Sequence, residues 1–490
     1  MQALTINALP EEVLSYILQH VRQSSSPASF VSCLVCCRTW HEVALREHYR
    51  DIVLGVSGLG LFLEKFPREK GHLVKSLTIT IDPSDFSKDL EQAENYEEVV
   101  FHNQNGLGNV GAVWSHMQCL PGVIRTMSQL STFSFVVGHG DARGFWLSRP
   151  LLGVVIKALP ETCVYLEIDT GGCDQDGPGS SHLCEILAGV IPRLHHLRLR
   201  LRRMCPALFG ADMPESGSGS DSDSSSDSDS GSAEEEGKKK SLVQSEPPSQ
   251  YPFLETAMIN CCSDSYVCTT FMGKRYGWTD YYINRPEART LIAEYLGQLD
   301  HSSSFPHIKR LWLLDLQRED SRCRSMYSAY NRRDIIRNKT WTIPYHPVKG
   351  HDDGSLLYLI RTPDNTEVLA KKWVIESLAE GETWKETLAG AKVPSALLIG
   401  QDDPAFEGRV EKPLPTMSVA AYRSRTPHST CCLWHNEEKT GTRLLSAIES
   451  DGVIEKHQVV ELTPPGWRRQ VYDAFSSSLE RDGLFLTPLQ

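Results

Sequence analysis

The feature that most constrains the fold is a short strand-like stretch that recurs along the chain, in most cases after a helix-like stretch. Five such stretches are apolar at every second position or nearly throughout, as strands with a buried face are. They are Leu77–Ile81, Phe133–Val137, Val164–Ile168, Leu197–Leu201 and Ile308–Leu313. Leu166 follows Phe133 by 33 residues, and Leu197 follows Leu166 by 31 residues. A strand and a helix repeated at such a period indicate stacked α/β units.

Helix-like stretches precede the last four of these strands. They are Val113–Met127, Leu151–Leu159, Leu183–Ile191 and Ala288–Leu299, and an additional copy of the unit begins at Phe253–Ile259. The sequence therefore predicts an α+β or α/β fold with an irregular leucine-rich-repeat-like solenoid, in two parts at 51–210 and 251–340. The period exceeds the roughly 20–29 residues of typical leucine-rich repeats, and their regular asparagine ladder is missing. An irregular α/β domain of another kind therefore stays open.

Residues 211–250 interrupt the array with sequence of low complexity. Ser, Asp, Glu and Gly dominate 216–237, and Lys238–Lys240 follow. We expect a disordered surface insertion here, because such a composition buries too little apolar surface to offset the entropy of ordering. Four serines have an acidic residue three positions on and resemble casein-kinase-type acceptor sites: Ser220, Ser224, Ser226 and Ser232. An unmodified, solvated spacer is the alternative.

The region 341–490 gives weaker patterns and is predicted as an α/β region that extends the array or packs across its end. Its expected strands are Leu356–Ile360, Ala396–Ile399 and Cys431–Trp434, and its expected helices are Glu367–Leu378 and Trp467–Leu479.

The charge balance disfavours a nucleic-acid partner. The chain of 490 residues has a net charge of −12, whereas affinity for nucleic acid comes largely from Lys and Arg that neutralise phosphates. No run of about 18 apolar residues is present, so we expect no membrane span. The first residues have neither the basic start nor the apolar stretch of a signal peptide. We therefore expect the protein in the cytoplasm, the nucleus or both.

Neither a cofactor nor a metal is expected. The 14 cysteines are predicted to be reduced thiols, and the C-x-x-C at Cys33–Cys36 has no second knuckle to complete a zinc site. The run Gly106-Leu-Gly108-Asn-Val-Gly111 matches the dinucleotide-binding motif in letters alone, because no strand runs directly into the glycines. No arrangement of acid, base and nucleophile is visible, so the sequence favours a non-catalytic protein.

The first fifty residues predict three short helices. Leu9-Pro10-Glu11-Glu12 begins the first, with proline at a position where its missing N–H costs nothing and acids that suit the helix dipole. Ser26-Pro27 begins the second, which carries Phe30, Val31, Leu34 and Val35, and the third is Arg38–Tyr49. Their apolar residues cover more than one face. Such a surplus indicates either a protein partner or cover by later residues of the same chain.

The residues at the two ends of this region resemble the F-box family. Two runs carry the resemblance: Leu9-Pro10-x-Glu12-Val13-Leu14-x-x-Ile17-Leu18 and Cys33-Leu34-Val35-Cys36-Cys37-Arg38-x-Trp40. Cys37 stands where the family often has Ser, Lys or Arg, which is a mild departure. The resemblance implies that residues 1–50 form a three-helix F-box that packs on the Skp adaptor of a cullin-RING ubiquitin ligase.

Carried over position by position, the resemblance implies six adaptor contacts. They are Leu9, Pro10, Leu14, Ile17, Val35 and Trp40. Of these, Leu14 and Trp40 are the foremost candidates for the core of the helical unit instead.

In F-box families the part after the box usually selects a target protein, so we expect the strand-lined concave face of the array to bind the target. The implied function is that of a substrate-recognition subunit, with an F-box scaffold that directs no degradation and a nucleotide-binding enzyme as alternatives. Four arginines on or beside one strand are expected to be exposed, and they either meet phosphate or the acidic insertion or form a solvated face: Arg198, Arg200, Arg202 and Arg203.

Overall fold

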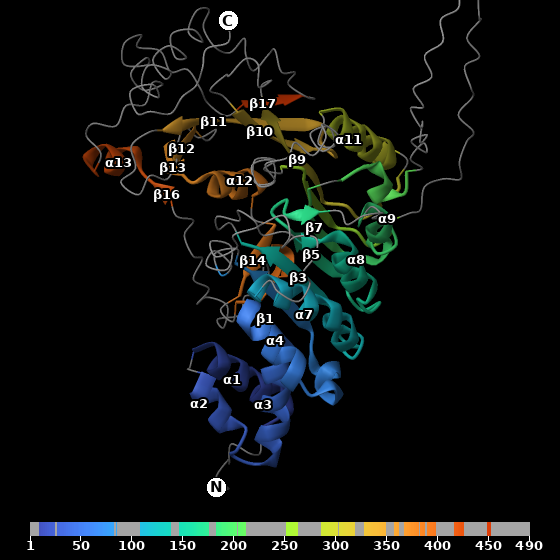
Figure 1. Ribbon diagram of the computed structural model, residues 1–490, viewed down its shortest axis with the longest axis vertical. Coiled ribbons are helices and arrows are strands. Elements are labelled where there is room, and N and C mark those ends of the chain that lie inside the picture. Colours follow the sequence, from blue (N-terminus) through green and yellow to red (C-terminus); the bar gives the residue numbers. More distant parts are fainter. Residues whose placement is uncertain are drawn as a thin grey trace, which may run out of the picture.

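In a computed structural model, the chain forms a three-helix unit followed by one continuous mixed sheet of 13 strands (Figure 1). The structure describes residues 9–24, 27–82, 85, 108–138, 147–175, 183–202, 204–211, 251–262, 286–301, 303–318, 328–348, 357–361, 367–381, 383–387, 390–397, 416–425 and 448–451. Figure 1 shows the helical unit at one end of an elongated molecule and the last strands at the other. Among the described helices, none has both the length and the apolar character to cross a membrane.

The helical unit comprises α1 (Glu11–Ser24), α2 (Pro27–Cys33) and α3 (Arg38–Arg50). It has a core of its own, formed by Leu14, Leu18, Phe30, Val43 and Ala44. The three predicted helices are therefore present. Leu34 and Val35 lie in a turn after α2, which is closed by hydrogen bonds of their backbone N–H groups to the carbonyls three residues earlier, at 3.0 and 3.2 Å.

The first half of the sheet consists of parallel strands in sequence order. They are β1 (Asp51–Leu54), β2 (Ser76–Ile81), β3 (Thr132–Val137), β5 (Tyr165–Asp169), β7 (His196–Arg200), β8 (Thr256–Asn260) and β9 (Arg310–Arg318). The strands predicted from the apolar stretches all occur. Four lie within one residue of the expected bounds, and β9 begins two residues later and ends five residues later than Ile308–Leu313. The predicted leucine-rich-repeat character of the array stays a prediction.

Helices connect these strands and line one face of the sheet (Figure 1). They are α4 (Val56–Lys65), η2 (Arg68–Leu73), α7 (Gly108–Ile124), α8 (Arg149–Lys157), α9 (Leu183–Ala188), η4 (Ile191–Arg193), η5 (Pro206–Phe209) and α11 (Pro286–His301). A helix that links parallel neighbours packs back on the sheet with one preferred hand, so successive units place their helices on the same side.

Beyond β9 the sheet becomes antiparallel. Its strands are β10 (Ser328–Asp334), β11 (Lys339–Val348), β12 (Leu357–Arg361), β13 (Glu367–Ala370), β16 (Thr416–Met417) and β17 (Ile448–Asp451), the last paired with β11. Smaller elements are the pair β4 (Leu147–Ser148) and β6 (Asp174–Gln175), the pair β14 (Trp384–Glu386) and β15 (Lys392–Pro394), and α12 (Lys372–Glu380), η7 (Ser395–Leu397) and α13 (Val419–Arg425). The sheet thus runs without a break across residue 340.

One prediction for the C-terminal region is wrong in its first residues, and another is wrong. The stretch Glu367–Leu378 is the strand β13 followed by α12. The expected helix is therefore present from Lys372, while the residues before it pair with the neighbouring strand β12, and this pairing overrides the helical pattern. The stretch Ala396–Ile399 overlaps the 3-10 turn η7, while the strand β15 precedes it. The predicted elements Cys431–Trp434 and Trp467–Leu479 lie outside the described residues.

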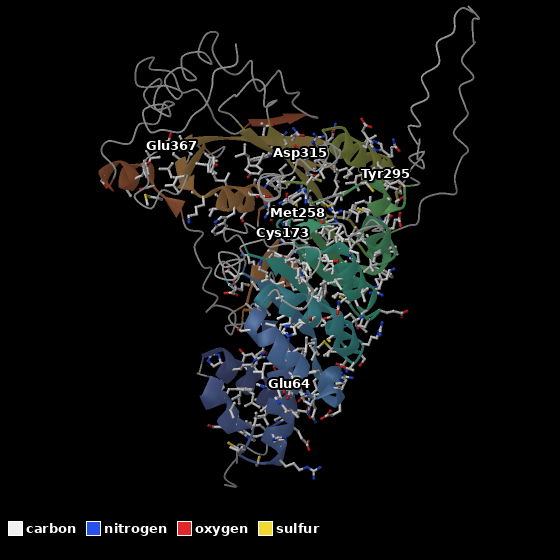
Figure 2. All side chains as sticks on the ribbon, in the orientation of Figure 1. Glu64, Cys173, Met258, Tyr295, Asp315 and Glu367 are labelled. Carbon is white, nitrogen blue, oxygen red and sulfur yellow. The ribbon has the colours of Figure 1, made fainter. Side chains whose placement is uncertain are left out.

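Two hydrophobic cores lie on opposite faces of the sheet, as the alternation of strand side chains requires. The larger is between the parallel strands and their helices. Its central row, which the strand register aligns, is Leu77, Phe133, Leu166, Leu197, Ala257 and Leu311. The smaller is between α12 and the strands from β8 onward, where Figure 2 labels its residue Met258.

Candidate functional site

The helical unit exposes large apolar side chains that its own core does not use. Val13, Tyr16 and Val31 are 43%, 42% and 47% exposed, and Val35 in the turn after α2 is 81% exposed. The described later residues therefore leave this surface open. An exposed group of apolar side chains on a small unit is typical of a surface that binds another protein.

The six residues predicted to contact the adaptor have different positions. Pro10 and Val35 are exposed, and Leu9 and Ile17 are half-buried. Leu14 is 1% exposed in the core of the unit, so its side chain holds the helices together and offers no contact surface.

Trp40 is half-buried and packs against the same core. Val13, Tyr16 and Val31 are surface candidates that the six implied contacts did not include. The sequence could have indicated them in one way only, since each is an apolar residue at a helix position that does not face the core of the unit.

The helical unit is joined to the sheet without a linker, since α3 ends at Arg50 and β1 begins at Asp51. Arg22 of α1 donates to the carbonyl of Glu47 and, at 2.6 Å, to that of Asp51. The hydroxyl of Ser15 donates to the Glu47 carboxylate at 2.7 Å. Burial raises the pKa of Asp51, although Arg50 and Arg22 lower it. These contacts fix the orientation of the unit relative to the first strand.

The face of the parallel sheet opposite the helices is polar. The strand register aligns Thr78, Ser134, Glu167 and Arg198 in one row, and Asp169, Arg200 and Asn260 in the next. We call this surface the polar face. It follows directly from the alternating sequence, because residues between the core positions of a strand point to the other side.

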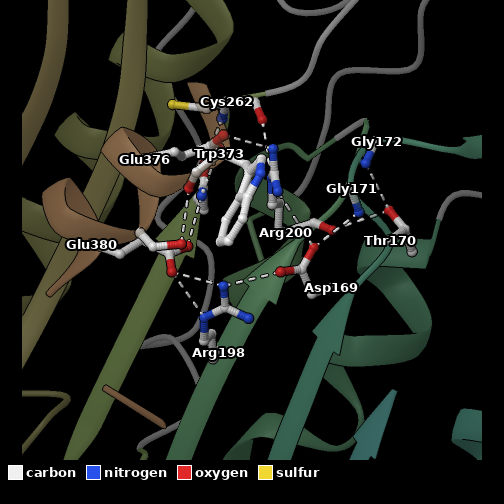
Figure 3. A network of polar contacts seen from close by, with 12 residues as sticks. Asp169, Thr170, Gly171, Gly172, Arg198, Arg200, Cys262, Trp373, Glu376 and Glu380 are labelled. Atoms are coloured by element: carbon white, nitrogen blue, oxygen red, sulfur yellow. Dashed lines mark hydrogen bonds and ion pairs between the residues drawn. The ribbon is translucent and has the colours of Figure 1, made fainter. Parts of the chain in front are cut away.

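The helix α12 covers the middle of the polar face, as Figure 3 shows. Its Glu380 accepts hydrogen bonds from Arg198 and Asn260, both at 2.7 Å. One turn earlier, Glu376 pairs with Arg200 at 2.7 Å. Because residues four apart lie on the same side of a helix, one face of α12 presents both carboxylates to the strands.

The network also includes carboxylates of the sheet itself. Arg198 pairs with Glu167 at 2.7 Å and with Asp169 at 3.0 Å. Burial alone lowers the pKa of Arg198, but the surrounding carboxylates, that of Glu380 first, outweigh this and raise the pKa well above its usual value. Both guanidinium groups of Arg198 and Arg200 are therefore permanently charged and neutralised within the protein.

The prediction that these arginines are exposed is wrong for two of them. Arg198 and Arg200 are 8% and 5% exposed, because α12 lies over them. Arg202 is half-buried, and Arg203 lies outside the described residues. The serines proposed as acceptor sites, Ser220, Ser224, Ser226 and Ser232, also lie outside them.

The pair β14–β15 continues the cover toward the helical unit. The backbone N–H of Lys392 donates to the hydroxyl of Thr78 at 2.9 Å, and its ammonium lies 3.9 Å from Glu167. The helix α12 and the pair β14–β15 thus cover the polar face from β8 to β2. In this part the face of the strands that the sequence suggested as a target surface is covered by the chain itself.

The described cysteines and acids do not form a metal site. Within the ranges given above, no three His, Cys, Asp or Glu side chains are grouped closely enough to hold a metal ion. Burial raises the pKa of Cys163 to about 12, so this thiol stays protonated and unreactive.

The comparison with known protein families matches the helical unit. Residues 6–54 match the family model described as F-box-like, a stretch that contains α1, α2, α3 and β1. No curated protein matches the chain at a significant level.

Proposed function

We propose, from the premise that residues 6–54 are an F-box-like domain, that the chain is the non-catalytic substrate-recognition subunit of a Skp/cullin/F-box ubiquitin ligase. F-box-like domains generally bind the Skp adaptor. The observation that carries the proposal is the open apolar surface of that domain, with Val35 81% exposed. A subunit of this kind makes no bond itself. It raises the effective concentration of a target protein near the enzyme that carries the activated ubiquitin.

The junction of α3 and β1 supports this role. Since Arg22 ties α1 to Asp51 at the start of the first strand, the adaptor and the sheet would be held at a fixed angle. A fixed angle matters for a receptor, because proximity accelerates a reaction only when the reacting groups are also oriented.

The test is a co-purification of the full chain with the adaptor and the cullin. The double variant Leu9→Ala/Pro10→Ala is expected to weaken adaptor binding by about 2–3 kcal/mol, without unfolding the rest of the chain, because it removes anchors from the contact surface. The matched control is Leu291→Ala on α11, which truncates another exposed apolar side chain, 51% exposed, far from the helical unit.

Adaptor and cullin captured together support the ligase subunit. Adaptor without cullin supports the scaffold instead. Wild-type adaptor binding by the double variant would refute the role of this surface.

A further inference from the structure

Two arginines and two tryptophans form a continuous stack across β9, β10 and β11. The guanidinium carbon of Arg310 lies 5.4 Å from the ring centroid of Trp312. That of Arg332 lies 4.7 Å from the same centroid and 5.2 Å from the centroid of Trp341. We call these four residues the arginine–tryptophan ladder. Arg310 is exposed and the other three are half-buried, so the ladder reaches the surface.

The strand register places the ladder on the polar side of the sheet, beside the end of α12. Arg332 pairs with Trp341 across β10 and β11, and Trp312 follows Met258 in the row that contains Arg198. The ladder is therefore the continuation of the polar face beyond the segment that covers it. At Arg198 this row of side chains is buried under α12, whereas at the ladder its side chains are partly exposed.

Helix α12 ends against the ladder and fixes it. Gly381, with φ +70, follows the helix, and a Cβ there would lie 3.4 Å from both Arg332 and Trp312. Glycine suits this position because of the positive φ, a backbone conformation that other residues rarely adopt. Arg332 donates to the carbonyl of Ala379 at 3.3 Å, where the helix dipole favours a cation.

Arg310 differs from its cationic neighbours in its partners. Lys309 pairs with Glu255, Arg333 with Asp315 at 2.9 Å, and Arg337 with Asp334 at 3.0 Å. Arg310 contacts the Trp312 ring and has no carboxylate partner among the residues that the structure describes. A guanidinium that stacks on a ring keeps its in-plane N–H donors available, and these match a carboxylate in a bidentate geometry.

We propose that the arginine–tryptophan ladder docks an acidic peptide segment, rich in Asp and Glu, of the protein that this subunit recruits. The inference rests on the proposed function for the source of the segment. Tryptophan and arginine are the residues most enriched where interfaces gain their affinity. Stacking orders the arginines before binding and so reduces the entropy lost on association. The net charge of −12 repels acidic peptides in general, so their binding requires a local site.

The test uses the purified full chain and an array of synthetic peptides of graded net charge, with serine-phosphorylated copies of the neutral peptides. The wild type is expected to retain the acidic peptides, with an affinity that falls as salt is added. Arg310→Glu should lower that affinity at least about tenfold, since it removes a charge-assisted contact and adds a repulsive one. Arg310→Lys should have an intermediate effect, because it keeps the charge and loses the fork.

The matched control is Arg125→Glu, which makes the same change of charge at an exposed arginine after α7. It should change peptide affinity less than about twofold, because charges beyond the screening length contribute little. Three results would overturn the proposal: no preference for acidic peptides, retention of the phosphorylated ones alone, or equal losses in the Arg310→Glu and Arg125→Glu variants.

Adaptor binding is measured on the same samples. Its retention in Arg310→Glu separates this inference from the proposed function, whose failure would instead appear as a loss of adaptor binding in the wild type. Arg310→Lys keeps the test decisive if charge reversal lowers the unfolding temperature.

Discussion

The helical unit and the polar face of the sheet each place side chains in an environment that is unfavourable for them. The two regions differ in where the partner that compensates this cost comes from. The unit leaves apolar residues such as Val35 in water. The polar face takes charged residues such as Arg198 out of water. An exposed apolar surface is satisfied by a second protein, whereas a buried charge must find its counter-charge within the fold.

The comparison separates a binding surface from a structural one. Arginines on the open side of a sheet suggested a surface for a partner, but α12 supplies their carboxylates from the same chain. Removing a residue should therefore affect stability at the polar face and affinity at the helical unit. The three predictions that follow test this division, from the largest expected effect to the smallest.

The largest effect is expected for Arg198→Ala. The change leaves the carboxylates of Glu167, Asp169 and Glu380 without their shared cation in a buried site, and should destabilise the protein by about 3–5 kcal/mol. Denaturant unfolding of the full chain measures it. The control is Arg38→Ala, whose 3.1 Å pair with Glu42 is on the surface, with the arginine side chain 92% exposed. It should change stability by less than about 0.5 kcal/mol. Similar losses in both variants would contradict the division.

An intermediate effect is expected when the pH is lowered, through His196, which lies two residues before Arg198 on the same side of β7. Burial lowers the pKa of its imidazole from 6.5 to about 4, with Glu255 opposing the shift and His195 and Lys309 adding to it. Between these values the unfolded chain binds a proton that the folded chain does not. The stability contributed by His196 is therefore complete above about pH 6.5 and is lost as the pH falls toward 4, on the order of 3 kcal/mol.

Unfolding of the wild type and of His196→Gln at a series of pH values measures this contribution. The variant should retain a partner for Thr256, which lies 2.6 Å from Nδ1 of His196. Its stability should decline less than that of the wild type across the window. Parallel pH curves for the two proteins would show that His196 does not titrate in this way.

The smallest effect is expected for Val35→Ser in the helical unit. Because this side chain is 81% exposed, the change should leave the unfolding temperature unaltered. It should weaken adaptor binding by about 1–2 kcal/mol, as the loss of an apolar interface anchor does. The control is Val154→Ser on α8, where the side chain is 48% exposed. Adaptor titrations distinguish them, and equal affinities of the two variants would place the contact surface elsewhere.

The sequence was sufficient wherever the signal is local. The alternation in Leu197–Leu201 identifies a strand and assigns its leucines to one face and its arginines to the other, as the structure has them. The three helices were predicted for the same reason, since their apolar spacing and first-turn residues lie within one short segment.

The cover of the polar face could not be read from the sequence, because its partners are far apart along the chain. Arg198 and Glu380 are separated by 182 residues, and neither has a neighbour that points to the other. The alternating pattern shows that the arginine side chain points away from the apolar core, but it does not show which residues pack against that side chain. The strand β13 was missed for a different reason, because its pairing with the neighbouring strand β12 competes with a plausible helical pattern.

The distance between Arg198 and Glu380 has a consequence for synthesis on the ribosome. At typical translation rates, the arginines emerge on the order of ten to forty seconds before the helix that neutralises them. During that interval the unfinished sheet has one side open to water, and a side lined with Thr, Ser, Glu and Arg is well hydrated. An apolar lining would expose the nascent chain to aggregation over the same interval. The charged lining thus keeps the growing polypeptide in solution until α12 arrives.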